Sequence, residues 1–119
     1  MEKIGFVGTG AMGSALLSRL KLANVSAVSF DITAAGQEAA RAEGATTLNS
    51  AKEVAQACTI VDVVVRTDQE AIDCMLGANG AVEGAAPGTL ILLHSTIRPS
   101  TTKKIALSAA EATCRRRTR

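Results

Sequence analysis

The chain has 119 residues, the size of a single domain, and 47% of them are hydrophobic. Its net charge is +2, and because four positive charges fall in residues 115–119, the rest of the chain is slightly acidic. No stripe of basic and aromatic side chains accompanies that tail, and no apolar stretch has the length of a membrane span. The composition therefore argues against nucleic-acid binding and against membrane insertion.

The cysteines and the single histidine do not predict a metal site. Cys58, Cys74 and Cys114 are odd in number and lack metal-ligand spacing, and His94 is the only histidine. We therefore expect no metal, and free thiols in a reducing compartment. Since the amino terminus leads straight into an apolar strand rather than a signal peptide, the expected localisation is cytoplasmic.

The first predicted strand is a short apolar run at residues 4–7, and a glycine motif follows it. Gly8, Gly10 and Gly13 have the G-x-G-x-x-G spacing. The next apolar residues have helical spacing, and they are Met12, Ala15, Leu16 and Leu20. A strand, a glycine turn and a helix in this order predict a dinucleotide-binding unit, although glycines that serve only the turn would give the same pattern.

Each glycine of the motif has a separate physical role. Gly8 allows a tight turn off the strand, where a side chain would be strained. Gly10 lets the backbone approach a pyrophosphate, and Gly13 lets the new helix pack closely on the strands. The start of the helix then presents unpaired N–H groups and the positive end of its dipole to the phosphates.

Asp31 stands at the end of the second predicted strand, residues 25–30, about twenty positions after the glycines. A carboxylate there accepts hydrogen bonds from the hydroxyls of the adenosine ribose and repels a 2′-phosphate. No Arg or Lys lies between Asp31 and Arg41 to reverse that preference. The sequence therefore favours NAD over NADP.

The remaining chain alternates between helical and strand patterns. Ser50 and Glu53 have the spacing of a capping box, which predicts a helix start. The strand predicted at 59–65 is almost wholly apolar, as expected of a strand covered on both faces. Further helices are predicted at 34–43, 68–76 and 100–114, the last capped by Ser100, and further strands at 25–30, 46–48 and 89–93.

Strands that alternate with helices of about ten residues predict right-handed β–α–β crossovers and a parallel sheet. The expected fold is α/β, a Rossmann-like doubly wound parallel sheet in a single domain. We assign residues 1–108 to this NAD(P)-binding domain and residues 109–119 to a basic tail that is expected to fray. Ligands bind outside the carboxyl ends of such strands, so the glycine turn, residues 65–68 and residues 94–96 are expected to line one crevice.

Three stretches resemble the β-hydroxyacid dehydrogenase family, which includes 3-hydroxyisobutyrate, tartronate-semialdehyde and threonate dehydrogenases. They are Gly5 to Leu20, Leu76 to Gly80, and Pro87-Gly88-Thr89 leading to Ser95-Thr96-Ile97-Arg98-Pro99. The resemblance covers about residues 3–106. It implies the amino-terminal domain of that family, which holds NAD(P).

This resemblance implies roles for individual residues. Asp31 would bind the ribose, and Val64 and Val65 would border the path from adenosine to nicotinamide. Ser95 and Thr96 would lie near the nicotinamide and the carboxylate of a substrate, with Thr96 also binding the cofactor; their alternative role is to cap the next helix. The residues around the pyrophosphate would be Gly8, Gly10, Ala11, Met12 and Gly13.

The chain also departs from the family pattern. Leu93 stands where the family usually has Asp, Val65-Arg66 where it often has Leu-Pro, and Glu70 where an Asn is frequent. Family members continue into an all-helical second domain that carries the catalytic lysine. Lys103 and Lys104 lie outside that motif, so we expect them on a solvated helix face.

The function expected from these observations is that of the NAD(P)-binding domain of an oxidoreductase for a small 3-hydroxy acid. NAD is the expected cofactor, with NADP as the alternative nucleotide. The chain is expected to end before the second domain and to be inactive alone, since that domain carries the lysine, and its exposed apolar surface predicts homo-oligomers. Two alternatives stay open, a non-catalytic nucleotide-binding or dimerising module and a fragment of a pyrroline-carboxylate-reductase-like enzyme. The Ser95-Thr96 segment argues against the second.

Overall fold

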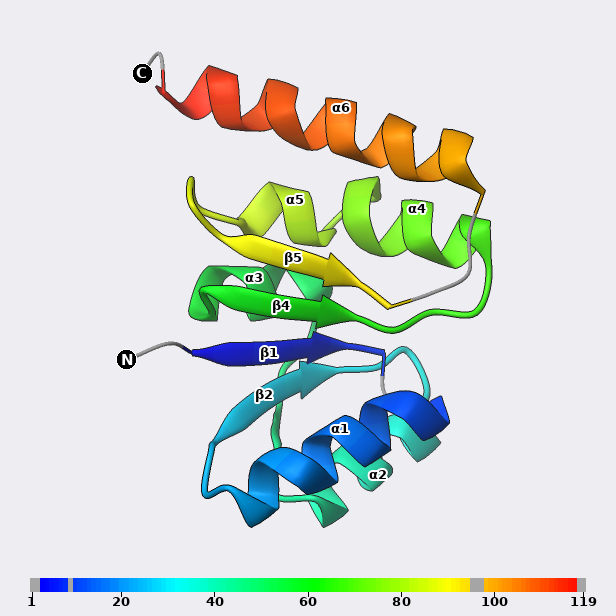
Figure 1. Cartoon of the computed structure of the whole chain (residues 1–119), viewed down its shortest axis with the longest axis vertical. Coiled ribbons are helices and arrows are strands. Elements are labelled where there is room, and N and C mark those ends of the chain that lie inside the picture. Colours follow the sequence, from blue (N-terminus) through cyan, green and yellow to red (C-terminus); the bar gives the residue numbers. More distant parts are fainter. Residues whose placement is uncertain (1–2, 9, 95–97, 118–119) are drawn as a thin grey trace.

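Five parallel strands form one sheet in the computed structural model of the chain (Figure 1). The structure describes residues 3–8, 10–94 and 98–117, with side chains described outside 10–12, 14 and 109–117. The strand order is β3-β2-β1-β4-β5, which confirms the predicted Rossmann-like sheet. The strands are β1 (Ile4–Val7), β2 (Ala27–Phe30), β3 (Thr46–Thr47), β4 (Ile60–Val63) and β5 (Leu90–Leu93).

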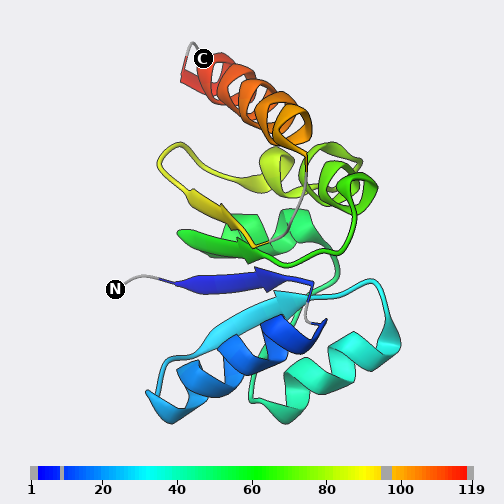
Figure 2. The same ribbon diagram turned by 45° about the vertical axis from the view of Figure 1, so that its right-hand side comes forward.

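Helices cover both faces of the sheet (Figure 2). The chain moves outward from β1 through β2 to β3 and then crosses back to β4. Because the crossovers are right-handed, this reversal moves the later helices to the opposite face. One face carries α1 (Gly10–Leu22) and α2 (Ala34–Ala42), and the other carries α3 (Ala51–Ala57), α4 (Asp68–Leu76) and α5 (Ala81–Gly84). The last helix, α6 (Pro99–Arg117), packs against α4 and α5.

The core consists of two clusters, one on each face of the sheet. Phe6 of β1 packs with Leu17 of α1 and Ala40 of α2, whereas Val61 and Val63 of β4 pack with the helices of the other face. Small residues dominate both clusters, which lets the helices lie close to the strands. Neighbouring side chains of one strand lie in different layers, as Phe6 and Val7 of β1 do.

Short side-chain caps explain where three of the helices begin. Thr33, Ser50 and Thr67 each have extended backbone, and each side-chain oxygen accepts a hydrogen bond from the backbone N–H three residues later. Such caps satisfy a donor that the first turn leaves unpaired. The predicted helix start at Ser50 and the predicted helix at residues 68–76 are confirmed.

Several predicted bounds are wrong in detail. The last helix begins at Pro99, so Ser100 lies inside it and is not its cap, and it ends at Arg117 rather than Cys114. Proline is favoured at the first helical position, and alanine and arginine favour helix at the other end. The helix α5 was not predicted, because four residues are too few for helical periodicity. The division of the chain into residues 1–108 and a tail stays a prediction.

Among the described residues, no helix has both the length and the apolar character needed to cross a membrane.

Candidate functional site

The carboxyl ends of four strands lie side by side and are joined by backbone hydrogen bonds. The Gly8 N–H donates to the carbonyl oxygen of Phe30, and the Val64 N–H donates to that of Val7, both at 2.8 Å. The His94 N–H donates to the carbonyl oxygen of Val63 at 2.8 Å. The strand order reverses between β1 and β4, which is where ligands of such sheets bind. The described parts of the three predicted strand ends are therefore brought together at one edge.

Gly8 makes the turn at the centre of this edge. Its φ is +83°, a conformation that residues with a side chain rarely adopt. An ideal Cβ on Gly8 would lie 2.0 Å from the carbonyl oxygen of Val64. A side chain there would collide with the main chain of the neighbouring strand end. The glycine is thus required by the backbone itself, and the turn lies directly against the end of β4.

The helix α1 begins two residues after this turn. Gly10, Ala11 and Met12 form its first turn, and Gly13 is buried. The first N–H groups of a helix have no partner within the helix and lie at the positive end of its dipole. No acidic residue lies in that first turn. The start of α1 can therefore receive an anion such as a phosphate group.

Asp31 directly follows β2, as predicted, and its carboxylate is held at the start of α2. Its Oδ1 accepts hydrogen bonds from the Thr33 N–H at 2.8 Å and from the Thr33 hydroxyl at 2.7 Å. A Cβ on Gly36 would lie 2.2 Å from the carboxyl carbon of Asp31. The missing side chain of Gly36 thus leaves the space that the carboxylate occupies.

Two departures from the family pattern contact each other, Arg66 in the loop after β4 and Glu70 in the first turn of α4. The Arg66 N–H donates to Glu70 Oε2 at 2.8 Å, and the Arg66 guanidinium lies 3.5 Å from Glu70 Oε1. Val64 and Val65, the predicted border of the cofactor path, are half-buried in this loop. Arg66 and Glu70 therefore stabilise the turn together, in a way that Leu-Pro and Asn would not.

A second carboxylate links the start of α4 to the start of α6. Asp68 Oδ2 accepts hydrogen bonds from the Thr101 hydroxyl at 2.7 Å and from the Arg98 N–H at 3.3 Å. The Thr101 hydrogen bond holds the pKa of the Asp68 carboxyl below its ordinary value of 3.8. Its contribution to stability is therefore present above that value and is lost as the pH falls through the lowered pKa. Ser95 and Thr96 lie outside the described residues.

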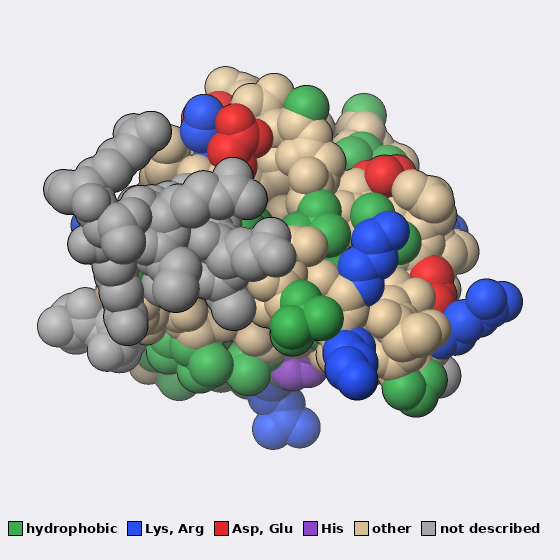
Figure 3. Space-filling model, turned by 90° about the horizontal axis from the view of Figure 1, so that it is seen from above, with side chains coloured by type: hydrophobic (Ala, Val, Ile, Leu, Met, Phe, Trp, Pro, Cys, Tyr) green, Lys and Arg blue, Asp and Glu red, His purple; other side chains and the backbone are tan. Residues whose placement is uncertain are grey.

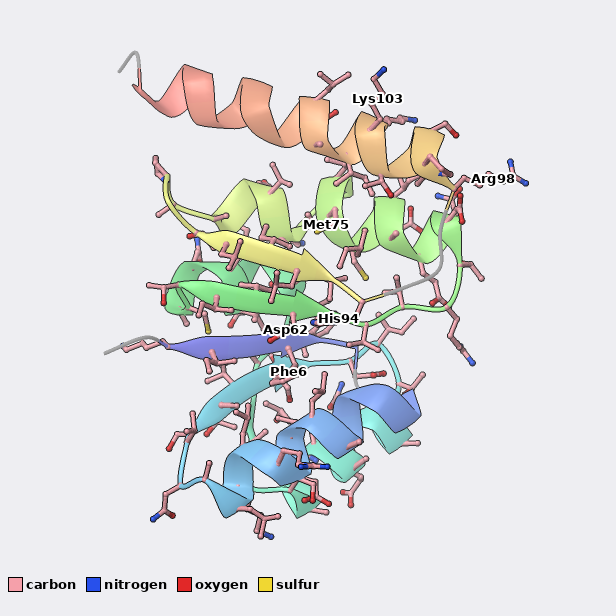
Figure 4. The ribbon with its side chains drawn as sticks, in the orientation of Figure 1. Phe6, Asp62, Met75, His94, Arg98 and Lys103 are labelled. Carbon is pink, nitrogen blue, oxygen red and sulfur yellow. The ribbon has the colours of Figure 1, made fainter. Side chains whose placement is uncertain are left out.

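The histidine at the end of β5 has a buried partner that the sequence analysis missed. His94 Nε2 lies 2.6 Å from Asp62 Oδ1, and the two labelled side chains lie next to each other (Figure 4). Asp62 and Ser29 are the buried polar residues in the described part of the chain. A charged residue inside the apolar run 59–65 was the available signal, because a buried carboxylate needs a partner.

The two described cysteines and Lys103 show no sign of a reactive role. Burial raises the pKa of the Cys58 and Cys74 thiols, so both stay protonated near neutral pH. Lys103 is exposed on the outer side of α6, as expected for a solvated face (Figure 4). In the described part of the chain, no group of three or more His, Cys, Asp or Glu residues could hold a metal ion.

Comparison with known proteins identifies the family to which this chain belongs. A family model described as the NAD binding domain of 6-phosphogluconate dehydrogenase matches residues 3–116. The chain belongs to this family of NAD-binding domains. The match covers nearly all of the chain, including the glycine turn and the loops at the carboxyl edge. It confirms that the chain is an NAD(P)-binding domain.

The relatives include dehydrogenases of hydroxy acids, and these confirm the resemblance to the β-hydroxyacid dehydrogenases. NAD-dependent L-serine dehydrogenase of Pseudomonas aeruginosa is 32% identical over 93% of this chain and 37% of its own length. 2-(Hydroxymethyl)glutarate dehydrogenase of Eubacterium barkeri is 34% identical over 92% of this chain and 36% of its own length. The structure of Mycobacterium tuberculosis 3-hydroxyisobutyrate dehydrogenase with L-serine superposes with a TM-score of 0.85, at 25% identity over 95% of this chain and 38% of that one.

The chain thus spans a little over a third of the length of these relatives, and the part that matches is their NAD-binding domain.

Proposed function

We propose that this chain binds NAD at the carboxyl edge of its sheet, as the nucleotide-binding part of a dehydrogenase for a small 3-hydroxy acid. The observation that carries the proposal is the position of the start of α1, which follows the Gly8 turn where the strand order reverses between β1 and β4. The first N–H groups of α1 have no partner within the helix, so they can hold a diphosphate. The membership in a family of NAD-binding domains supports it.

Different residues at the carboxyl edge of the sheet would contact different parts of the nucleotide. Gly8, Gly10 and Gly13, with Ala11 and Met12 in the first helical turn, would surround the pyrophosphate. Asp31 would accept hydrogen bonds from the ribose hydroxyls, in the position where Thr33 already holds its carboxylate. That negative charge would repel a 2′-phosphate, so we propose NAD rather than NADP as the preferred nucleotide.

The other half of the nucleotide would extend toward β4 and β5. Val64 and Val65 would border it, and Ser95 and Thr96 remain the predicted contacts of the nicotinamide and of the substrate carboxylate. NAD supplies the acceptor for the hydride that leaves the hydroxyl-bearing carbon. We propose that turnover also needs the lysine that family members carry in their second domain, which would accept the hydroxyl proton.

Calorimetric titration of the purified chain with NAD and NADP tests the nucleotide site. We expect saturable binding of NAD and weaker binding of NADP, with no absorbance of reduced cofactor when 3-hydroxyisobutyrate or L-serine is added. No heat with either nucleotide on folded protein would refute the site. Hydride transfer by the chain alone would refute the need for the lysine, and it would exclude the non-catalytic module.

Asp31→Ala should weaken NAD binding about tenfold, because it removes charged hydrogen bonds to the ribose. The affinity for NADP should fall less, since the same change removes the repulsion between Asp31 and the 2′-phosphate. The ratio of the NAD affinity to the NADP affinity should therefore decrease. Gly36→Ala should act in the same direction, because the added methyl would occupy the space of the Asp31 carboxylate. Both ratios can be measured by calorimetry. An unchanged ratio in Asp31→Ala would remove this residue from the site.

Self-association and the compartment stay predictions. The apolar side chains of β5 support the first, since Leu90 and Leu92 are exposed on a strand that pairs with β4 alone among the described strands. Sedimentation velocity over a range of protein concentrations would reveal a dimer. A constant monomer mass would exclude one.

A further inference from the structure

Asp62 is an unusual residue for the position it occupies. It lies inside β4, with Phe6 of β1 and Leu92 of β5 as its register partners. Phe6 belongs to the core layer on the α1 face, so Asp62 lies on that same face. Only 12% of its side chain is exposed. A buried carboxylate is costly unless it is paired, and its partner here is His94 at 2.6 Å.

One ring nitrogen of His94 is available for contact with a ligand. Its Nε2 is engaged by Asp62, whereas no hydrogen bond joins its Nδ1 to the described residues, and 34% of its side chain is exposed. In the space-filling view the histidine reaches the surface, with hydrophobic side chains on one side of it and a basic side chain on the other (Figure 3). A carboxylate that holds one ring nitrogen also fixes the orientation of the ring. The imidazole is therefore anchored and accessible at once.

The register places the backbone of His94 level with the glycine turn. The Val64 N–H bonds to Val7 next to Gly8, and the His94 N–H bonds to Val63 next to Val64. Gly8, Val64 and His94 thus form a row across three strand ends. Adjacent strands lie about 4.8 Å apart, so the row spans about 10 Å. This is the direction in which a dinucleotide continues from the pyrophosphate, because its adenosine half lies on the Asp31 side.

We propose that the Asp62–His94 pair binds the nicotinamide riboside half of the dinucleotide, with His94 as the contacting residue and Asp62 as its positioning residue. This inference rests on the proposed function. An imidazole whose Nε2–H is given to a carboxylate offers Nδ1 as an acceptor, and after protonation as a donor. The carboxamide of nicotinamide and the hydroxyls of its ribose carry both donors and acceptors, so either form of the ring finds a partner.

The first test uses the unmodified chain, because its single histidine gives unambiguous ring resonances in NMR spectra. Any purification tag with histidine is removed, and NAD, ADP-ribose and ADP are titrated at one fixed pH. We expect the ring resonances to shift with NAD and to stay in place with ADP, which lacks the nicotinamide riboside. ADP-ribose separates a contact with the second ribose, which it also contains, from a contact with nicotinamide.

The second test compares affinities for NAD and ADP in variants. His94→Gln and Asp62→Asn should each weaken NAD binding, His94→Gln by about tenfold, while ADP binding stays the same. If the pair had only a structural role, these substitutions would lower the stability of the fold or change the affinities for NAD and ADP equally. The matched control is Arg41→Gln, which breaks the exposed Glu38–Arg41 ion pair in the last turn of α2 and should change neither affinity.

The outcomes separate this proposal from the one on which it rests. If the unmodified chain binds neither NAD nor ADP, the proposed function fails. If it binds NAD but the histidine resonances stay in place, or shift equally with NAD and ADP, the Asp62–His94 proposal is overturned. Equal loss of NAD and ADP affinity in a folded His94→Gln variant overturns it as well. The NMR titration decides the matter if that variant does not fold.

Discussion

Gly8→Ala should cost the domain about 3 kcal/mol or more of its free energy of unfolding, a large share of the 5–15 kcal/mol typical of a domain. The alanine would have to adopt the φ of +83° that Gly8 has, and its Cβ would lie 2.0 Å from the Val64 carbonyl oxygen. That oxygen belongs to the main chain beside β4, so it cannot move away cheaply. Urea unfolding followed by circular dichroism measures the loss.

Gly44→Ala is the matched control for this prediction. Gly44 has the same φ of +83°, but a Cβ there would meet nothing within 4 Å. Its substitution should therefore cost only the conformational penalty, about 1 kcal/mol. The difference between Gly8→Ala and Gly44→Ala isolates the collision with Val64. Equal costs would show that the turn does not lie against the end of β4 as the structure has it.

Gly10→Val should abolish NAD binding, by a factor of about a hundred or more, and leave the fold intact. Gly10 is the first residue of α1 and has helical backbone, so valine is not strained there. The isopropyl group would instead stand where the pyrophosphate approaches the main chain, and it would also keep the phosphates from the N–H groups of the first turn. A loss of about 2.7 kcal/mol corresponds to that factor.

Calorimetry with NAD and a thermal melt by circular dichroism check both halves of this expectation. The control is Ala42→Val at the exposed last residue of α2, which adds two of the three carbon atoms that Gly10→Val adds and should bind NAD normally. If Gly10→Val kept full affinity, the pyrophosphate would have to lie elsewhere. If it unfolded the domain, Gly10 would be a structural glycine like Gly8.

These two glycines show how one sequence motif combines two physical demands. Gly8 is needed by the chain itself, because the turn brings β1 against β4 with no room for a side chain. Gly10 is needed by the ligand that we propose. The spacing in the sequence predicts that both matter, but only the Cβ distance at Gly8 shows which of them the fold requires without a ligand.

Much of the fold could be predicted because its signals are local. Ser50 caps its helix through a hydrogen bond to Glu53, three residues away, and the helix at 68–76 ends where Gly77 interrupts it. The alternation of strands and helices predicts parallel crossovers, and Asp31 follows its strand by simple adjacency. Each of these features depends on neighbours within one or two turns of chain, so the order of residue types is sufficient to reveal it.

Only the tertiary structure decided which distant residues meet. Asp62 and His94 are 32 positions apart, and Asp68 and Thr101 are 33 apart, yet each pair shares a hydrogen bond. Their contacts depend on the order and register of the strands, since a shift of one residue would turn Asp62 to the opposite face of the sheet. A linear sequence shows which side chains exist, whereas the register of neighbouring strands sets which of them touch.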